Sequence, residues 1–232
     1  MRSLVRVHAP SCFLHGGATL PYKAGEHAHD RVDRMSKSVR ELLTEMKDTS
    51  EVIVDLAYAA LLFDSEEIAT EVRKLEEEMD TLKYEIRIKA MLATRNKRDA
   101  VQLSGLLQIA SAAEAISNAA GDMVKLLDLE VDKRPFLSFV LKDAEEKIRM
   151  LTLSEKSDMQ NRSIQDLSVE SETGMRIIAI KRGKRWIYGP EDTTSLKAGD
   201  ILIVRGTEDG CETLKRYACG DKKWPAYPQE GS

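Results

Sequence analysis

The feature that most constrains the fold lies near the C-terminus, where β-branched runs alternate with glycine turns. Residues 175–181 read Met-Arg-Ile-Ile-Ala-Ile-Lys, and the same strand chemistry returns at 186–188 after a Gly-Lys pair. A Gly-Asp turn then leads into the apolar run 201–204. Such runs between tight turns are typical of β-strands. The segment therefore predicts three strands, and the Thr-Glu-Asp at 207–209 predicts the start of a helix after them.

The order of elements extends this pattern upstream. Residues 148–153 predict one more strand and residues 163–169 a short helix, so the order is β, α, β, β, β, α. From about residue 146 to residue 220, this pattern resembles the C-terminal RCK domain, also called TrkA-C. That family supplies regulatory modules of potassium channels and potassium uptake systems. The resemblance implies a small α/β domain that pairs as a dimer and, in some relatives, binds a nucleotide or an ion in the cleft between the two copies.

Two surfaces of this module are candidate sites. Four cations surround the glycine of the predicted hairpin, and they are Lys181, Arg182, Lys184 and Arg185. Clustered cations concentrate positive potential, so the tip is a candidate anion or nucleotide contact, and a solvated turn is the other interpretation. Met175, Ile178 and Ile180 are candidates for the dimer interface on one strand face. Asp200 is expected to serve only as a turn residue.

Between residues 36 and 129 the apolar spacing changes to that of helices. We predict helices over 36–63, from Asp64 to a polar turn at 94–98, and over 98–129. Apolar residues three and four apart line each helix, and Asp64 with Glu67 predicts a capping box. Three long antiparallel helices with short loops form a bundle. The fold class expected for the whole chain is therefore α+β multi-domain.

Charge is distributed unequally over these helices. The second carries a charged outer face, whereas residues 52–63 contain Asp55 as their one charge and residues 100–121 contain Glu114 as theirs. Segments that are apolar nearly all round are expected to be mostly buried. A lone buried carboxylate costs several kcal/mol unless it is paired, protonated or bound to a cation.

Each of these two acids has oxygen-bearing neighbours at helical spacing. The set consists of Glu51, Asp55, Glu114, Asn118 and Asp122. The spacing resembles the E(D)-x-x-x-D motifs of the PhoU family, whose helical repeats hold metal ions, although Asn118 stands where that family has Asp. The resemblance implies a divalent metal such as Mg²⁺, Mn²⁺ or iron, held by oxygen ligands. A buried polar network and an exposed partner surface remain open as alternatives. One repeat is present where the family has two, so a homodimer would rebuild the six-helix arrangement.

Composition and motifs bound the function. The chain has 232 residues and a net charge of −4, which gives no argument for nucleic acid as a partner. Cys12, Cys211 and Cys219 have no metal-binding spacing and are expected to be free thiols. No glycine-rich phosphate loop is present, and no histidine follows His29, so a histidine-activated nucleophile is absent and no enzymatic activity is expected.

The expected layout has five parts. They are an extension over 1–34, either disordered or the result of a wrongly chosen start codon before Met35, then the PhoU-like domain 35–129, a hinge 130–145, the TrkA-C domain 146–220 and a tail 221–232. No apolar run is long enough to cross a membrane. The resemblance to both families implies a cytoplasmic regulatory subunit of a cation transport system, held at the inner face of the plasma membrane by a transporter or channel. The resemblance favours potassium as the transported ion, and a divalent cation is the second candidate. A PhoU-type regulator of phosphate transport is the alternative.

Overall fold

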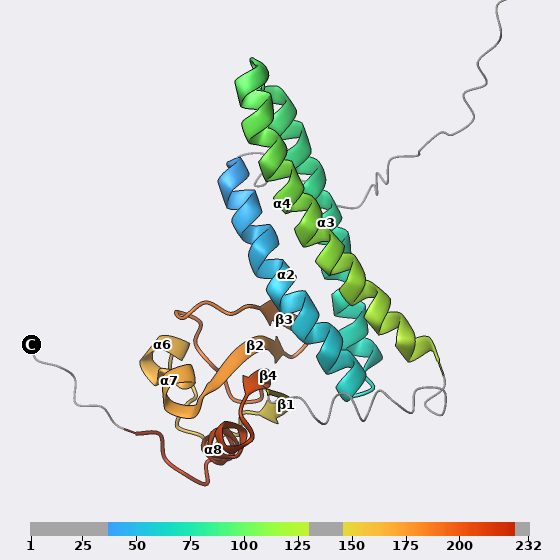
Figure 1. Ribbon diagram of the computed structural model, residues 1–232. Helices are drawn as coiled ribbons and strands as arrows, with labels where there is room; N and C mark the ends of the chain where they lie inside the picture. The colour runs from blue at the N-terminus through green and yellow to red at the C-terminus, as the bar shows by residue number, and fades with distance from the viewer. Residues whose placement is uncertain (1–36, 130–145, 226–232) are drawn as a thin grey trace, which may run out of the picture. The chain divides into compact units, whose positions relative to one another are not determined.

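The computed structural model describes residues 37–129 and 146–225. Its elements, in chain order, are the helices α2 (Val39–Leu62), α3 (Glu66–Ala93) and α4 (Lys97–Val124), the 3₁₀ turn η1 (Lys125–Asp128), the strand β1 (Lys147–Thr152), the helices α6 (Ile164–Leu167) and α7 (Val169–Thr173), the strands β2 (Met175–Arg182), β3 (Arg185–Tyr188) and β4 (Ile201–Gly206), and the helix α8 (Glu208–Cys219). Figure 1 shows the three long helices side by side and the four strands with the short helices. The predicted α+β class, with a three-helix bundle followed by a small domain, is confirmed. The predicted extension and hinge, and the tail beyond residue 225, lie outside the described residues.

Side-chain caps set where the long helices begin. Ser38 and Glu41 form a reciprocal capping box at α2, and Asn96 accepts from the backbone N–H of Asp99 at α4. The cap predicted at Asp64 is wrong: Ser65 caps α3 and accepts from the N–H of Ile68 at 3.3 Å. Asp64 instead adopts a left-handed conformation with φ of 48°, which reverses the chain between α2 and α3. An aspartate tolerates this region better than most residues, so it fits the turn rather than the cap.

The bundle buries one face of each helix, and the buried fraction is larger for the end of α2 than for α4. Residues 52–63, at the end of α2, are buried or half-buried except for Tyr58, with Ile53, Leu56 and Ala57 fully inaccessible, which agrees with the prediction. The same prediction for residues 100–121 is wrong, because α4 exposes Val101 at 64%, Ile109 at 60% and Ile116 at 46%. An uncharged helical segment can pack against the core of its own chain or against another molecule. Composition alone does not distinguish these two cases.

The four strands form one antiparallel sheet in the order β1-β4-β2-β3. Gly183, with φ of 61°, permits the tight turn between β2 and β3. A bulge between Ile177 and Ala179 shifts the register of β2 against the central strand β4. Because of the bulge, the adjacent Ile178 and Ala179 lie on the same face, whereas Ile178 and Ile180 lie on opposite faces. The bulge is not visible in the sequence pattern.

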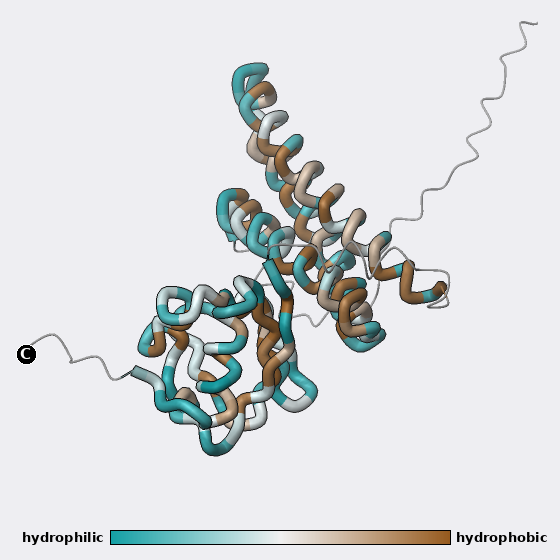
Figure 2. The backbone as a smooth tube through the Cα atoms, turned by 60° about the horizontal axis from the view of Figure 1, so that its bottom comes forward, coloured by the Kyte–Doolittle hydropathy of each residue, from teal (hydrophilic) through white to brown (hydrophobic). Residues whose placement is uncertain are grey.

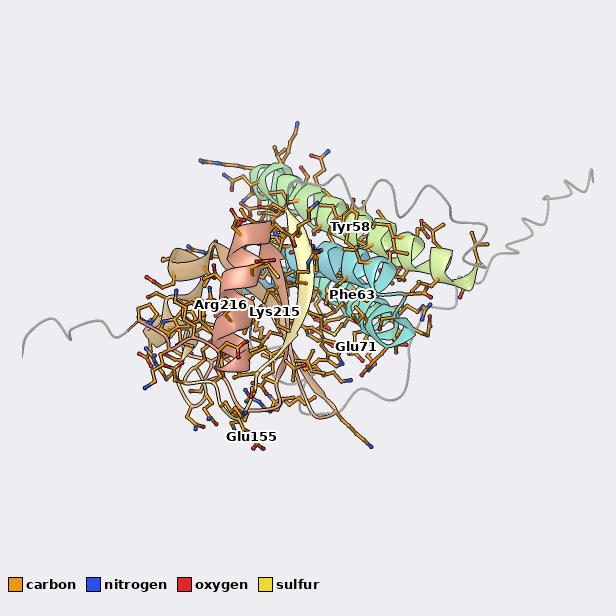
Figure 3. All side chains as sticks on the ribbon, turned by 90° about the horizontal axis from the view of Figure 1, so that it is seen from below. Tyr58, Phe63, Glu71, Glu155, Lys215 and Arg216 are labelled. Carbon is orange, nitrogen blue, oxygen red and sulfur yellow. The ribbon has the colours of Figure 1, made fainter. Side chains whose placement is uncertain are left out.

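Both faces of the sheet are covered. One face packs on α6, α7 and α8 through Leu202, Val204 and Leu214, and the other packs on the long helices through Ile203. Seen from below in Figure 3, Lys215 and Arg216 of α8 lie on one side of the sheet, while Tyr58 of α2 and Phe63 directly after α2 lie on the other. The strands are the hydrophobic centre of this domain (Figure 2). The sheet therefore joins two cores rather than bounding one.

The prediction of a dimer face on β2 is wrong, because its three residues are buried within the chain. Met175 and Ile180 are fully buried in the core beneath α8, whereas Ile178 is buried in the core that contains α2 and α3. The bulge thus places Ile178 on the face opposite to Met175 and Ile180, so the three do not form one surface. All three are occupied by contacts within the chain.

Candidate functional site

The junction between helices and sheet is organised around Asp55. Its carboxylate accepts two hydrogen bonds from Nη1 of Arg205 on β4, at 2.9 and 3.1 Å. The Nε of Arg205 also lies 3.2 Å from Glu146. Burial raises the pKa of Asp55, and the nearby Arg205 guanidinium opposes this rise without cancelling it. The lone charge in this apolar segment is thus paired across the two domains.

Glu51, one turn earlier on α2, lies at the edge of the same contact. Its carboxylate is 2.9 Å from Lys47 and 3.9 Å from Arg176 of β2. The hydrogen bond from Lys47 is the largest cause that lowers the pKa of Glu51. The predicted pair Glu51 and Asp55 is therefore on one helix face, and both acids face arginines of the sheet.

A second set of polar contacts joins α3 to the β2–β3 hairpin. Tyr188 donates a hydrogen bond to Glu71, a carboxylate that is 7% exposed and also pairs with Lys74. Burial is the main reason that the pKa of Tyr188 is raised, and Glu71 adds to it. Lys181 lies 2.6 Å from Glu67. Together with Asp55 and Arg205, these contacts tie the helical domain to the sheet at separate points.

The basic hairpin is only partly available to a ligand. Lys181 is engaged with Glu67, and Arg182 donates to both carboxylate oxygens of Asp200 at 2.8 and 2.7 Å. Asp200 is fully buried and also accepts from the N–H of Lys197 at 2.8 Å, which agrees with its predicted role in the turn. The remaining cations, Lys184 and Arg185, are exposed at the tip. The anion contact stays a prediction that concerns mainly these two residues.

The second predicted row of oxygens, on α4, faces α3 instead of the sheet. Glu114 pairs with Lys83 of α3, and Asn118 is half-buried one turn later. Asp122 is exposed and pairs with Lys125 at 2.6 Å. The structure therefore gives Asp55 and Glu114 different partners on different elements. Within residues 37–129 and 146–225, no three His, Cys, Asp or Glu side chains are grouped to hold a metal ion.

Sequence analysis missed two acids that lie beside this row. We call the set Glu76, Asp80, Glu114 and Asp122 the acidic seam between α3 and α4. Burial raises the pKa of Glu76 and of Asp80, and the neighbouring Glu114 raises that of Asp80 further. The Glu76 carboxylate lies against Gly121, where any Cβ would collide with it.

A local signal for these acids was present. Glu76 and Asp80 are themselves an acid pair four residues apart, the same spacing as Glu51 and Asp55. Their place within a run of glutamates led to the interpretation of a solvated face. The position of Gly121 on the facing helix was the second signal, because a glycine inside a helix is costly without a close neighbour.

Two domain families match the chain where these two cores lie. The PhoU domain family matches residues 43–127 and the TrkA-C domain family matches residues 148–218. The chain carries a PhoU domain followed by a TrkA-C domain. These matches confirm the predicted resemblance to both families.

Two curated relatives come from the same organism. Potassium channel protein 1 of Methanocaldococcus jannaschii is 31% identical over 83 residues, which are 36% of this chain and 25% of that protein. Probable potassium channel protein 2 of the same organism is 29% identical over 104 residues, 40% of this chain and 30% of that protein. This chain therefore spans about a quarter to a third of the length of the curated relatives it matches.

One similar solved structure is the RCK_C domain dimer of S. agalactiae BusR in complex with c-di-AMP. It is 27% identical with a TM-score of 0.31, and the match covers 33% of this chain and 95% of that chain. A score this low supports no conclusion about the ligand of the present protein. None of the described helices combines the length and hydrophobicity needed to cross a bilayer.

Proposed function

We propose that this protein is a regulatory subunit of a cation transport system, with potassium as the transported ion. Its TrkA-C domain would sense a small ligand or an ion, and its PhoU domain would convey that state to a membrane transporter or channel. The matched TrkA-C domain and the two potassium channel relatives support the regulatory and potassium parts of this proposal. The proposal assigns the chain no enzymatic activity and no nucleic-acid partner, and it places the protein in the cytoplasm beside the membrane.

The single observation that carries the proposal is the shared core between the two domains. Ile148, Ile178 and Ile203 of the sheet are buried together with Ile53 and Leu56 of α2. A packed core is not continuously deformable, so a change in the sheet must be accompanied by repacking of α2. Coupling between a ligand and a transporter requires such an element, with two states that the ligand binds unequally.

A thermal-melt panel on the full chain tests the sensing part. The additions are K⁺, Na⁺, Mg²⁺, Mn²⁺, phosphate, ATP and c-di-AMP. A ligand at about 100 times its dissociation constant adds about 2.7 kcal/mol of stability, which a melt detects. We expect a shift with K⁺ or with a nucleotide. The variant with Lys184→Ala and Arg185→Ala reports whether the exposed hairpin cations contribute, and Lys215→Ala with Arg216→Ala on α8 is the matched control. A panel with no shift contradicts ligand sensing by this protein.

The alternative is a PhoU-type metal-binding regulator of phosphate transport, and the match to the PhoU domain family supports it. Burial raises the pKa values of Glu76 and Asp80, and a divalent cation bound beside these carboxyls would stabilise their charged forms. A shift with Mg²⁺ or Mn²⁺ alone, which Glu76→Gln with Glu114→Gln removes, would favour this alternative. A divalent shift that persists in this variant while Asp55→Asn removes it would instead assign the metal to the row on α2.

A further inference from the structure

The long helices expose an apolar surface that no other described part of the chain covers. Ten large hydrophobic residues are exposed in the described part of the chain, and eight of them lie on the second half of α3, on α4 or directly after it. The eight are Tyr84, Ile88, Met91, Leu92, Val101, Ile109, Ile116 and Leu129. Apolar residues gathered in this way mark an interaction surface, whereas scattered ones do not. We call the exposed side of α4 the α4 face.

Charge is missing from the α4 face over its whole middle. Residues 100–121 contain Glu114 as their one charged residue, and Glu114 is turned to Lys83 of α3 with a side chain that is 19% exposed. What the helix exposes there is aliphatic, small or uncharged polar, including Gly105, Gln108 and Ala112. Depletion of charge is characteristic of the buried centre of a protein–protein interface.

Gly105 gives an independent indication that another backbone approaches this face. A glycine within a helix costs about 1 kcal/mol relative to alanine. A Cβ at Gly105 would meet nothing within 4 Å, so no contact among residues 37–129 and 146–225 requires a glycine there. Gly121 shows the contrast, because there the Glu76 carboxylate occupies the space of the missing side chain. Close approach from outside the chain would account for Gly105.

We propose that the α4 face is the contact with a second copy of this chain, with the two α4 helices packed antiparallel about a two-fold axis. The order of large and small residues on the face is self-complementary in this arrangement. With the axis near residues 110 and 111, Val101 lies opposite the partner's Ala119, Gly105 opposite the partner's Ile116, and Ile109 opposite the partner's Ala112. Large side chains thus meet small ones throughout, as a two-fold contact between identical surfaces requires.

Charges at the two ends of the face fit the same register. Arg98, which is exposed near the start of α4, lies opposite the partner's Asp122. Both copies contribute this pair, one at each end of the contact. Beyond it, the exposed Met91 and Leu92 at the end of α3 come beside the partner's Leu129. The segment from Arg98 to Asp122 is about 36 Å long at 1.5 Å per residue. A strip of that length and about 10 Å width has a smaller area than the standard interface of about 800 Å² per partner. A stable dimer therefore requires that the residues at both ends of α4 also belong to the contact.

A groove beside the α4 face would receive side chains of the second copy. It lies between α2 and α4 and is lined by Val39, Leu43, Leu106 and Ile109 together with polar residues of α2. Ile109 belongs both to this groove and to the α4 face. This inference does not depend on the proposed function, because it concerns a helix face and not the TrkA-C domain.

Cross-linking in the full chain tests the register. In a background with Cys12→Ser and Cys219→Ser, the double variant Ile109→Cys with Ala112→Cys should form an interchain disulfide under mild oxidation, since these positions face each other across the axis. Arg87→Cys, at an exposed position on α3, is the control and should remain unlinked. Absence of the interchain disulfide in the double variant would overturn the proposal. Binding of the wild type to phosphatidylcholine–phosphatidylglycerol vesicles, without a cross-link, would overturn it in favour of a membrane contact.

Mass measurement by light scattering provides the second readout. Gly105→Leu has room within its own chain but fills the space that a partner backbone needs. We expect its assembly mass to be half that of the wild type, with unchanged helix content by circular dichroism, while Arg87→Leu keeps the wild-type mass. A Gly105→Leu protein of unchanged mass that still forms the interchain disulfide in the double-cysteine background would contradict the contact. Unchanged mass with loss of the disulfide would support it, with the TrkA-C domains then holding the copies together.

Discussion

The pair formed by Asp55 and Arg205 makes a sharp prediction, because its two members are unequally buried. Their side chains are 14% and 33% exposed, respectively. Removing one partner of a fully buried pair costs about 3–5 kcal/mol, whereas an exposed pair contributes about 0.2–1 kcal/mol. The pair lies between these limits, and the more buried member should suffer more from losing its partner.

The two single substitutions should therefore differ in cost. Arg205→Met keeps the aliphatic stem but leaves Asp55 buried without its cation, and we expect a loss of about 2–3 kcal/mol near pH 7. Asp55→Asn leaves Arg205 more open to water and still 3.2 Å from Glu146. For that variant we expect a loss of about 1 kcal/mol. A double-mutant cycle should give a coupling of about 1–2 kcal/mol.

The pH dependence separates electrostatics from lost packing. Burial already raises the pKa of Asp55, and Arg205 opposes that rise. Without Arg205 the pKa of Asp55 rises further, so the carboxyl is neutral over a wider range of acidic pH. The penalty of Arg205→Met should hence be largest near pH 7 and should shrink as the pH falls through the raised pKa of Asp55.

Urea denaturation near pH 7 and near pH 4 measures these quantities, with Arg149→Met as the control. Arg149 pairs with Glu208 on the outer side of the sheet, where the two side chains are 35% and 54% exposed, so its loss should cost under about 1 kcal/mol. Equal costs for Arg205→Met and Asp55→Asn, or a cost of Arg205→Met that does not change with pH, would refute the reasoning.

Three further outcomes are expected. Asp200→Ala should destabilise the protein by about 2–4 kcal/mol in urea denaturation, because it leaves the half-buried Arg182 guanidinium without its carboxylate. Gly210→Ala should cost about 1–3 kcal/mol in the same assay, since its Cβ would collide with the backbone carbonyl of Thr173. Glu76→Gln should melt higher than the wild type at pH 7 but not at pH 4: the raised pKa of Glu76 means that its contribution is present below the unfolded value of 4.5 and is lost as the pH rises through the folded pKa. Equal melting temperatures of Glu76→Gln and the wild type at pH 7 would contradict the last expectation.

Local signals explain what could be predicted from the sequence. The Gly183 turn and the β-branched residues beside it specify β2 and β3, whose paired residues are at most nine positions apart. Thr207 caps α8 because its side chain reaches the N–H of Gly210 three residues later. Contacts of this range are encoded in adjacent residues, so the order and approximate bounds of the elements follow from pattern alone.

Partners far apart in the sequence explain what could not be predicted. Asp55 was recognised as a charge that needs compensation, but Arg205 is 150 positions away on a strand whose outward face depends on the sheet register. The β2 bulge changes which residues face the helices, and Ile178 therefore lies apart from Ile180. The exposure of α4 follows the same rule, because burial depends on what packs against a helix and not on its residues alone.

Strand β4 connects the basic hairpin to the contact between Asp55 and Arg205. It begins directly after Asp200, which holds Arg182 of the basic hairpin, and it carries Arg205, which holds Asp55 of α2. The two residues are separated by five positions, or about 17 Å of strand, so they do not interact directly. A ligand that draws Arg182 away from Asp200 can therefore affect Asp55 only by moving β4 between its neighbours β1 and β2. Because both faces of β4 are packed, such a movement has to repack α2 as well, and this is the physical condition under which the binding of a small ligand to the sheet changes the helical domain.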